Sequence, residues 1–175
     1  MNRQVEFFNT GDQLPTVLSY LWLIVDGVVK SYTVNQEGKT AILGFWGKQE
    51  VIGKSLSSVT PYFLQCMNDV QAIAIPSEQW DTISVNLLDR IQQIQQISYI
   101  IRNSQDDRLW LLLQWLARKF GDETLEGTTI SFRLTEQELA DALGMDRILV
   151  ERILDRLEQE NLISRLENQY ILLRE

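Results

Sequence analysis

The sequence contains no histidine and only one cysteine, Cys66. The lack of histidine excludes imidazole metal ligands, serine–histidine and cysteine–histidine nucleophile pairs, and the usual pH switch. One cysteine forms no disulfide within the chain and builds no cysteine-based zinc or iron–sulfur site. We therefore expect no metal, no cofactor and no enzymatic activity. Cys66 lies in an apolar stretch, so we expect a small buried hydrophobe, with a redox sensor as the alternative.

Long apolar runs and leader-like segments are also missing. Residues 1–14 show neither a basic start followed by an apolar run nor a small-residue cleavage pattern, and no stretch approaches 18 consecutive apolar residues. We expect a cytoplasmic protein with no membrane contact. The 175 residues, 45% of them hydrophobic, are enough for one full domain or two small ones.

Positive charge is scarce. The chain has 16 Lys and Arg against 24 Asp and Glu, a net charge of −8. Residues 106–175 alone hold nine basic and fifteen acidic side chains, a net charge of −6, which leaves −2 for the rest. Because duplex DNA attracts cations and repels carboxylates, this balance disfavours nucleic-acid binding unless the local arrangement of charges compensates.

The N-terminal part is typical of short β-strands. Turn-forming pairs at Asp26-Gly27 and Glu37-Gly38 separate apolar segments, and an alternating segment ends at Pro76. Several strands at regular spacing predict a small β-sandwich or roll, followed by a helix after Pro76 with Ser77 as a capping candidate. The predicted strands are 21–25, 28–32, 32–34, 40–43 and 71–75.

Between residues 86 and 120 the apolar residues recur at steps of three and four, which predicts helix. Gly121 is the expected stop of this region. A narrow stripe within it resembles a two-helix seam, and we favour self-association as a homodimer because the helix is long for so small a domain. The alternative is packing on the chain's own β-roll. The candidate dimer-interface residues are Ile91, Ile94, Ile97 and Ile101.

A helix-turn-helix is predicted after an acidic connector, 122–127, and a short strand, 130–134. Thr135 and Glu138 have the spacing of a capping box, Gly144 ends the first helix, and Asp146 is placed to cap the second. A helix, a glycine-containing turn and a second helix make a DNA-reading unit. The buried stripe of the second helix is expected to be Val150, Ile153, Leu154 and Leu157.

The exposed face of the second helix carries the candidate base contacts. Arg147 and Arg152 are candidate guanine readers, because a guanidinium can donate two hydrogen bonds to guanine O6 and N7. The alternative is a solvated, salt-bridged face.

Two short strands, 161–163 and 168–173, follow around a polar tip as a wing. The candidate DNA-binding residues are Thr135, Gln137, Arg147, Ile148, Glu151, Arg152, Arg165 and Gln169. Among them, Thr135, Gln137 and the wing positions are expected to contact the DNA backbone.

This segment resembles the Crp/Fnr family over nearly thirty positions, from Thr135-x-Gln137-x-Leu139-Ala140 to Asn161-Leu162-Ile163, and residues 21–27, 37–38, 43–45 and 51–53 look like the family's cyclic-nucleotide-type β-roll. The resemblance implies an α+β fold with a β-roll shortened at its front (1–85), a dimerisation helix (86–105) and a winged helix-turn-helix (106–175). It also implies a homodimeric transcription regulator whose partners are double-stranded DNA, at a palindromic operator, and RNA polymerase.

The chain departs from that family at the effector site. Members that bind cyclic AMP have a Gly-Glu pair and a later Arg-Ser pair, whereas this chain has Gly53-Lys54 and no arginine within 63–67. A phosphate buried without a cation is costly, so we expect no response to cyclic AMP. Haem or iron–sulfur sensing is disfavoured by the histidine and cysteine counts. We expect Lys54 to be exposed, with a metabolite carboxylate or phosphate as an alternative ligand.

A second departure concerns DNA. Glu136, Asp146, Leu149 and Glu151 stand where the family often has hydroxyl or basic residues facing phosphates. Asp146 is explained as a helix cap, but Glu136 and Glu151 are not. Two hypotheses therefore stay open: a homodimeric, sequence-specific DNA-binding regulator, or a degenerate member that binds DNA weakly and acts as a protein-interaction module or heterodimer partner.

Overall fold

The computed structural model describes residues 4–82, 87–166 and 169–173, with side chains 81–92 left undescribed. The chain divides into two compact units, Met1–Arg90 and Ile91–Glu175. Antiparallel sheets and α-helices together confirm the predicted α+β class. The predicted boundary between residues 85 and 86 falls outside the described residues.

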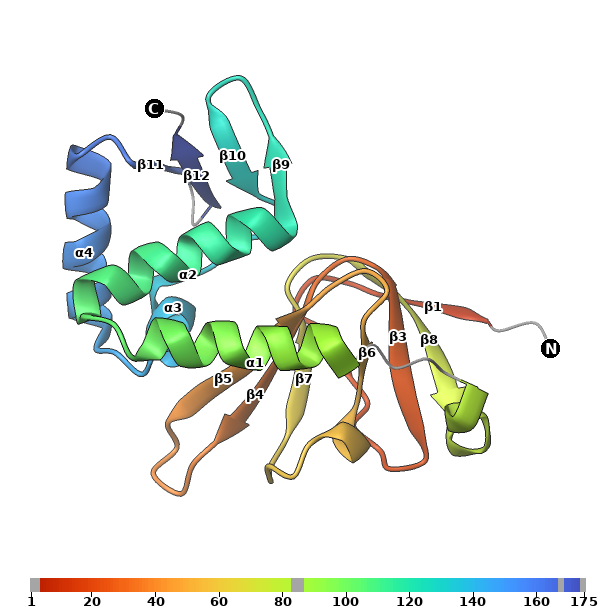
Figure 1. Cartoon of the computed structure of the whole chain (residues 1–175). Coiled ribbons are helices and arrows are strands. Elements are labelled where there is room, and N and C mark those ends of the chain that lie inside the picture. The colour runs from red at the N-terminus through yellow and green to blue at the C-terminus, as the bar shows by residue number, and fades with distance from the viewer. Residues whose placement is uncertain (1–3, 83–86, 167–168, 174–175) are drawn as a thin grey trace. The chain divides into compact units, whose positions relative to one another are not determined.

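The N-terminal unit contains two antiparallel four-stranded sheets (Figure 1), which confirms the prediction of a β-sandwich or roll. Two short 3-10 helices, η1 (Lys54–Leu56) and η2 (Ser77–Thr82), follow β6 and β8. One sheet has the order β1 (Val5–Phe8), β8 (Val70–Pro76), β3 (Tyr20–Asp26) and β6 (Val51–Ile52). The other has the order β2 (Gln13–Leu14), β7 (Phe63–Cys66), β4 (Val29–Val34) and β5 (Thr40–Trp46).

Side chains from both sheets form one hydrophobic core. Trp22 is 1% exposed, and its indole N–H donates to the carbonyl oxygen of Pro15 at 2.9 Å. The indole N–H of Trp46 donates to the Ser31 hydroxyl at 2.8 Å. Each large ring is therefore buried with its one polar atom satisfied. Other members of the core are Leu14, Ile24, Val29, Ile52, Tyr62, Leu64, Cys66, Val70 and Ala72.

The two glycine turns have different roles. Gly38, with φ +79°, closes a hairpin in which β4 pairs with β5. Gly27, with φ +88°, instead carries the chain from one sheet to the other, because β3 and β4 do not pair. A Cβ at Gly27 would lie 2.4 Å from the carbonyl oxygen of Asp69, so this crossing requires glycine.

The predicted helical region forms two helices, α1 (Leu87–Ile101) and α2 (Gln105–Phe120). Ser104 caps α2 by accepting the N–H of Asp107 at 3.3 Å, and Lys119 on α2 donates to Gln93 on α1 at 2.6 Å. Gly121 is the C-cap of α2, as predicted. Within the described ranges, no helix is long and apolar enough to span a membrane.

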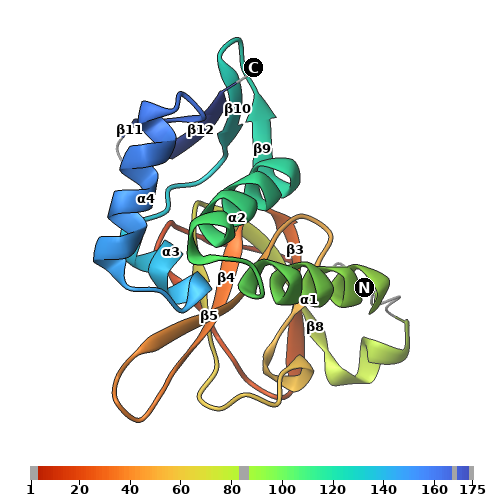
Figure 2. The ribbon, with the colours of Figure 1, turned by 60° about the vertical axis from the view of Figure 1, so that its left-hand side comes forward.

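The C-terminal unit packs α2, α3 (Glu136–Leu143) and α4 (Arg147–Gln159) beside one antiparallel sheet (Figures 1 and 2). The fully buried side chains of α2 include Leu109, Leu113 and Leu116, and those of α3 and α4 include Leu139 and Leu154. The order of the sheet is β11 (Ile163–Leu166), β12 (Gln169–Leu173), β10 (Gly127–Ile130) and β9 (Gly121–Glu123).

Two strand predictions and one connector prediction in this unit were wrong in position. The strand expected at 130–134 lies at Gly127–Ile130, and the expected connector 122–127 overlaps β9. The first wing strand begins at Ile163, because Asn161 adopts φ +55° in the turn that follows α4. Strand β10 begins at Gly127, where it pairs with β12. The two backbones approach so closely at this point that a Cβ on Gly127 would lie 1.9 Å from the Leu172 carbonyl oxygen. The expected wing tip, 164–167, was misplaced as well, because residues 164–166 belong to β11, while residue 167 lies outside the described residues.

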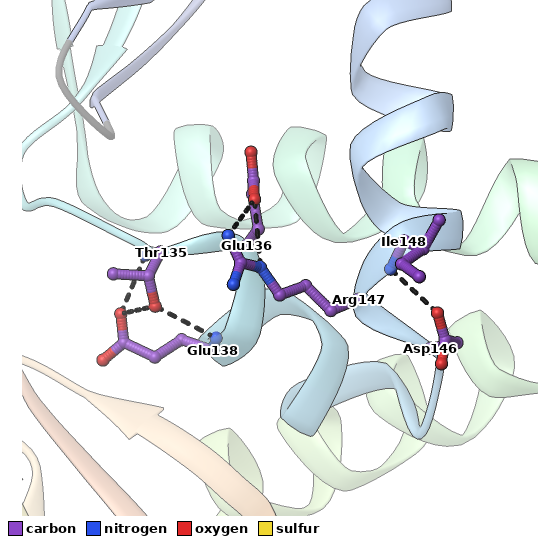
Figure 3. Close-up of polar contacts among 6 residues, drawn as sticks. All are labelled: Thr135, Glu136, Glu138, Asp146, Arg147 and Ile148. Carbon is purple, nitrogen blue, oxygen red and sulfur yellow. Dashed lines mark hydrogen bonds and ion pairs between the residues drawn. The ribbon is translucent and has the colours of Figure 1, made fainter.

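The start and end signals of the helix-turn-helix are confirmed. The Thr135 hydroxyl accepts the N–H of Glu138 at 3.2 Å, and the Glu138 carboxylate accepts the N–H of Thr135 at 2.8 Å (Figure 3). Gly144 ends α3 with φ +62°. Asp146 caps α4 by accepting the N–H of Ile148 at 2.8 Å. Local hydrogen bonds thus fix where both helices begin.

Replacing Thr135 by Ala should lower the free energy of unfolding by about 1 kcal/mol, because the cap loses its side-chain acceptor. Chemical denaturation followed by circular dichroism measures this change. Thr135→Ser keeps the hydroxyl and is the matched control. Equal stability of the Ala and Ser variants would show that the capping box contributes nothing.

Candidate nucleic-acid interface

The first two turns of α4 present an exposed face. Ile148 is 67% exposed, and Arg147, Glu151 and Arg152 are exposed as well. The opposite face packs into the unit as predicted, through the buried residues Val150, Ile153, Leu154 and Leu157. The packing of α4 therefore determines which residues face outward, and they include four of the predicted DNA-binding residues.

Arg147 is not free on this face. Its Nε and Nη2 donate to Oε2 of Glu136 at 3.2 Å and 3.1 Å, and Figure 3 shows the side chain reaching from α4 toward the start of α3. The Glu136 side chain is 23% exposed and that of Arg147 is 62% exposed. Glu136, which the sequence left without a structural role, thus pairs with a predicted base-reading residue.

Arg152 differs from Arg147. Among the residues that the structure describes, its side chain has no hydrogen-bond or ion-pair partner, and the same holds for Glu151. Arg152 is exposed one helical turn after Ile148. Its five N–H donors are therefore available to an external acceptor.

Arg165 lies on the first wing strand, β11, opposite Tyr170, and is held by α4. Its Nη2 donates to Asp155 at 2.6 Å and to Glu158 at 2.7 Å, while its Nε and backbone N–H also donate to Glu158. Partial burial lowers the pKa of Arg165, but the bonded carboxylates outweigh it and raise the pKa above its usual value. This guanidinium joins β11 to α4 and is largely neutralised by its neighbours.

The remaining predicted contacts are Thr135, Gln137 and Gln169. Thr135 is exposed, but its hydroxyl is engaged in the capping box. Gln137 is exposed and donates to Asp141 on the same helix at 2.8 Å. Gln169 is half-buried and donates to the Ile130 carbonyl oxygen at 3.4 Å. Thr135 and Gln137 therefore lie at the start of α3, while Gln169 bonds within the sheet.

Sequence patterns did not predict these ion pairs. Glu136 and Arg147 are eleven residues apart on different helices, and Asp106 pairs with Arg156 from fifty residues away. Periodicity identifies partners three or four positions apart on one helix, and it carries no signal for these pairs. The only sequence hint was the excess of acidic residues in this unit.

Lys54 in the N-terminal unit was predicted to be an exposed lysine, and this was wrong. It is half-buried, and its Nζ donates to the Val59 carbonyl oxygen at 2.6 Å, to the Thr60 hydroxyl at 2.8 Å and to the Ser57 carbonyl oxygen at 3.3 Å. The ammonium thus holds the loop that precedes β7. The sequence cannot show this role, because loop carbonyls of any residue type accept such bonds.

Cys66 is 2% exposed and belongs to the core of the first unit, as expected. Burial raises the pKa of its thiol to about 12, with Asp12 and Asp69 adding to the effect. The reactive thiolate is therefore scarce near neutral pH.

A β-roll joined in sequence to a winged helix-turn-helix defines a class of transcription regulator, and comparisons with known proteins agree. Residues 107–175 match the Crp-like helix-turn-helix domain. The regulatory protein CysR of Synechococcus elongatus is 31% identical over 151 residues, which cover 83% of this chain and 72% of CysR. The chain belongs to the Crp/Fnr family of transcription regulators, whose members are not enzymes.

More distant relatives and a solved structure agree with this family assignment. The fumarate and nitrate reduction regulatory protein of Escherichia coli is 25% identical over 166 residues, 87% of this chain, and the chain spans 65% of its length. A CRP-family transcriptional regulator from Thermus thermophilus superimposes with a TM-score of 0.81 at 18% identity, covering 97% of this chain and 92% of that structure. The structural match confirms the fold.

Because the pKa of Cys66 is raised, iodoacetamide at pH 8 should alkylate the native protein at least about tenfold more slowly than the protein unfolded in urea. Mass spectrometry of the intact chain over time measures both rates. The unfolded sample is the control, since the chain has a single cysteine. Equal rates would contradict the burial of the thiol.

Proposed function

We propose that the chain is a homodimeric, sequence-specific DNA-binding transcription regulator that uses the exposed start of α4 as its recognition surface. The observation that carries this proposal is the outward placement of Arg147, Ile148 and Arg152 on a helix whose other face is buried. The second helix of a helix-turn-helix enters the major groove with its N-terminal residues toward the base edges.

The residues on this surface suit several base edges. Arg152 and Arg147 can donate to guanine O6 and N7, Ile148 can contact a thymine methyl group, and Glu151 can accept from the N4 of cytosine. Arg152 is the leading guanine reader, because its donors have no partner within the described part of the chain. Thr135 and Gln137, at the start of α3, are proposed to contact the DNA backbone, together with the wing at 165–169.

Exposed apolar residues on α1 support the homodimer. Ile94 is 63% exposed and Ile101 is 42% exposed, with half-buried Ile97 between them on the same stripe. The side chain of Ile91 lies outside the described side chains. Two symmetric copies of α4 would contact half-sites about one helical turn apart, roughly 34 Å, in a palindromic operator. The proposal includes RNA polymerase as a partner and the cytoplasm as the place of action.

Cyclic AMP is not the proposed effector. Lys54 already uses its ammonium on loop acceptors, and within β7 the side chains of Leu64 and Cys66 are buried in the core. Phe63 stacks on Tyr32 with ring centroids 5.2 Å apart. None of these groups offers a cation for a cyclic phosphate, which supports a regulator that does not respond to it.

The second candidate is a protein-interaction module or heterodimer partner with weak DNA binding. It is favoured by the ion pairs of Arg147, Arg156 and Arg165, whose positive charges are offset by carboxylates of the same unit. Failure of the purified protein to shift any duplex at low salt would favour this candidate over the first.

Substituting Arg152 by Ala should weaken operator binding by about 1–3 kcal/mol, roughly 5- to 150-fold, and relax the preference at one base pair of each half-site. Electrophoretic mobility shifts at fixed salt measure the affinity. Arg156→Ala, which removes an equal charge that is paired with Asp106, is the matched control. Equal losses in both variants, with base preference unchanged, would exclude base reading by Arg152.

Placing a charge at the proposed dimer stripe should dissociate the protein. Ile94→Glu should halve the mass measured by light scattering at micromolar concentration, because a carboxylate is costly in an apolar seam. Leu125→Glu is the control, since Leu125 is fully exposed between β9 and β10. A monomeric wild-type protein, or an Ile94→Glu variant that keeps its mass, would contradict the homodimer.

A further inference from the structure

One ion pair on the recognition surface joins the first residues of α3 and α4, Glu136 and Arg147. Both positions directly follow a capping residue, Thr135 for α3 and Asp146 for α4. The two side chains meet across the turn (Figure 3). Because hydrogen bonds fix both helix starts, the two ends of the ion pair are held at a defined separation.

The contact occupies only one edge of the Arg147 guanidinium. Nε and one N–H of Nη2 face Oε2 of Glu136, while Nη1 has no partner among the residues that the structure describes. A guanidinium carries five N–H donors in a rigid plane. The two N–H groups of Nη1 and the second N–H of Nη2 therefore remain available, and one from each nitrogen can be donated to guanine O6 and N7.

Glu136 is the more fixed partner. Its side chain is 23% exposed, against 62% for Arg147. It stands in the first turn of α3, where the unpaired backbone N–H groups favour a carboxylate. The carboxylate therefore orients the guanidinium, and the open edge of Arg147 faces away from it.

We infer that Glu136 is a positioning residue for base reading, which presents the open edge of Arg147 to DNA and thereby raises sequence discrimination. The inference rests on the proposed function, in which Arg147 contacts a base. An arginine that is oriented before binding loses less side-chain freedom at a matched base. The same carboxylate repels the phosphates of any DNA sequence, so it lowers affinity for matched and unmatched sites alike.

The test compares Glu136→Gln with the wild type on a selected operator and on a scrambled duplex, at low and moderate salt. Binding to the scrambled duplex should tighten, while the ratio of operator affinity to scrambled affinity should fall about two- to tenfold. Glu160→Gln is the charge-matched control. It removes a carboxylate at the other end of α4, where Glu160 is 4.0 Å from Arg156, and should leave the ratio unchanged.

A double-mutant cycle shows whether Glu136 acts through Arg147. In an Arg147→Ala background, Glu136→Gln should not change the ratio of operator affinity to scrambled affinity further, because the guanidinium that Glu136 orients is gone. Selection from a random library should also place the weakened preference of both single variants at the same base pair. A purely structural role would not produce this coincidence.

Two results would overturn the inference while the proposed function stands. One is that Glu136→Gln and Glu160→Gln give the same ratio of operator affinity to scrambled affinity. The other is that Glu136→Gln gives a higher ratio than the wild type, which would mean that the carboxylate blocks the arginine. Failure of the wild-type protein to bind any duplex would overturn the proposed function itself, and the inference with it.

Discussion

The left-handed turn between α3 and α4 is the constraint on which the recognition surface depends. Gly144 adopts φ +62°, which glycine tolerates without a steric penalty, and the N–H of Met145 closes the turn on the Ala140 carbonyl oxygen. Asp146 then starts α4 at once. This geometry directs one face of α4 into the core and brings Arg147 within reach of Glu136. A residue with a Cβ at this position would adopt the same φ at a cost of roughly 1–2 kcal/mol.

The acidic balance of the C-terminal unit has a structural explanation in part. Carboxylates at Asp106, Glu136, Asp155 and Glu158 hold two arginines of α4, Arg147 and Arg156, and Arg165 of the wing, so they connect elements as well as repel phosphate. Exposed ion pairs contribute little stability, and their main effect is to fix where each guanidinium points. A surface of this kind has few free cations for the phosphate backbone, which makes specific base contacts a larger share of any affinity for DNA.

Much of the helix-turn-helix was predictable from the sequence, because its signals are local. The capping box at Thr135 and the stop at Gly144 depend on residues within four positions, and the buried stripe of α4 repeats at steps of four or fewer. The displaced strand β10, the crossing at Gly27 and the loop contacts of Lys54 depend on partners that the fold brings from elsewhere in the chain. Glu136 belongs to this second group, since its role needs the turn that places Arg147 beside it. A local pattern identifies an element, but it does not identify what that element contacts.

The exposed start of α4 is proposed to recognise a specific DNA sequence as part of a symmetric dimer, and the other proposals depend on this recognition. Selection of bound duplexes from a random library by the purified wild-type protein, at low and at moderate salt, tests it most directly. We predict enrichment of a palindrome whose half-sites are centred about one helical turn apart, roughly 10 base pairs, and retain their base preference as the salt concentration rises. No enriched sequence at either salt concentration, or a single asymmetric site, would contradict it.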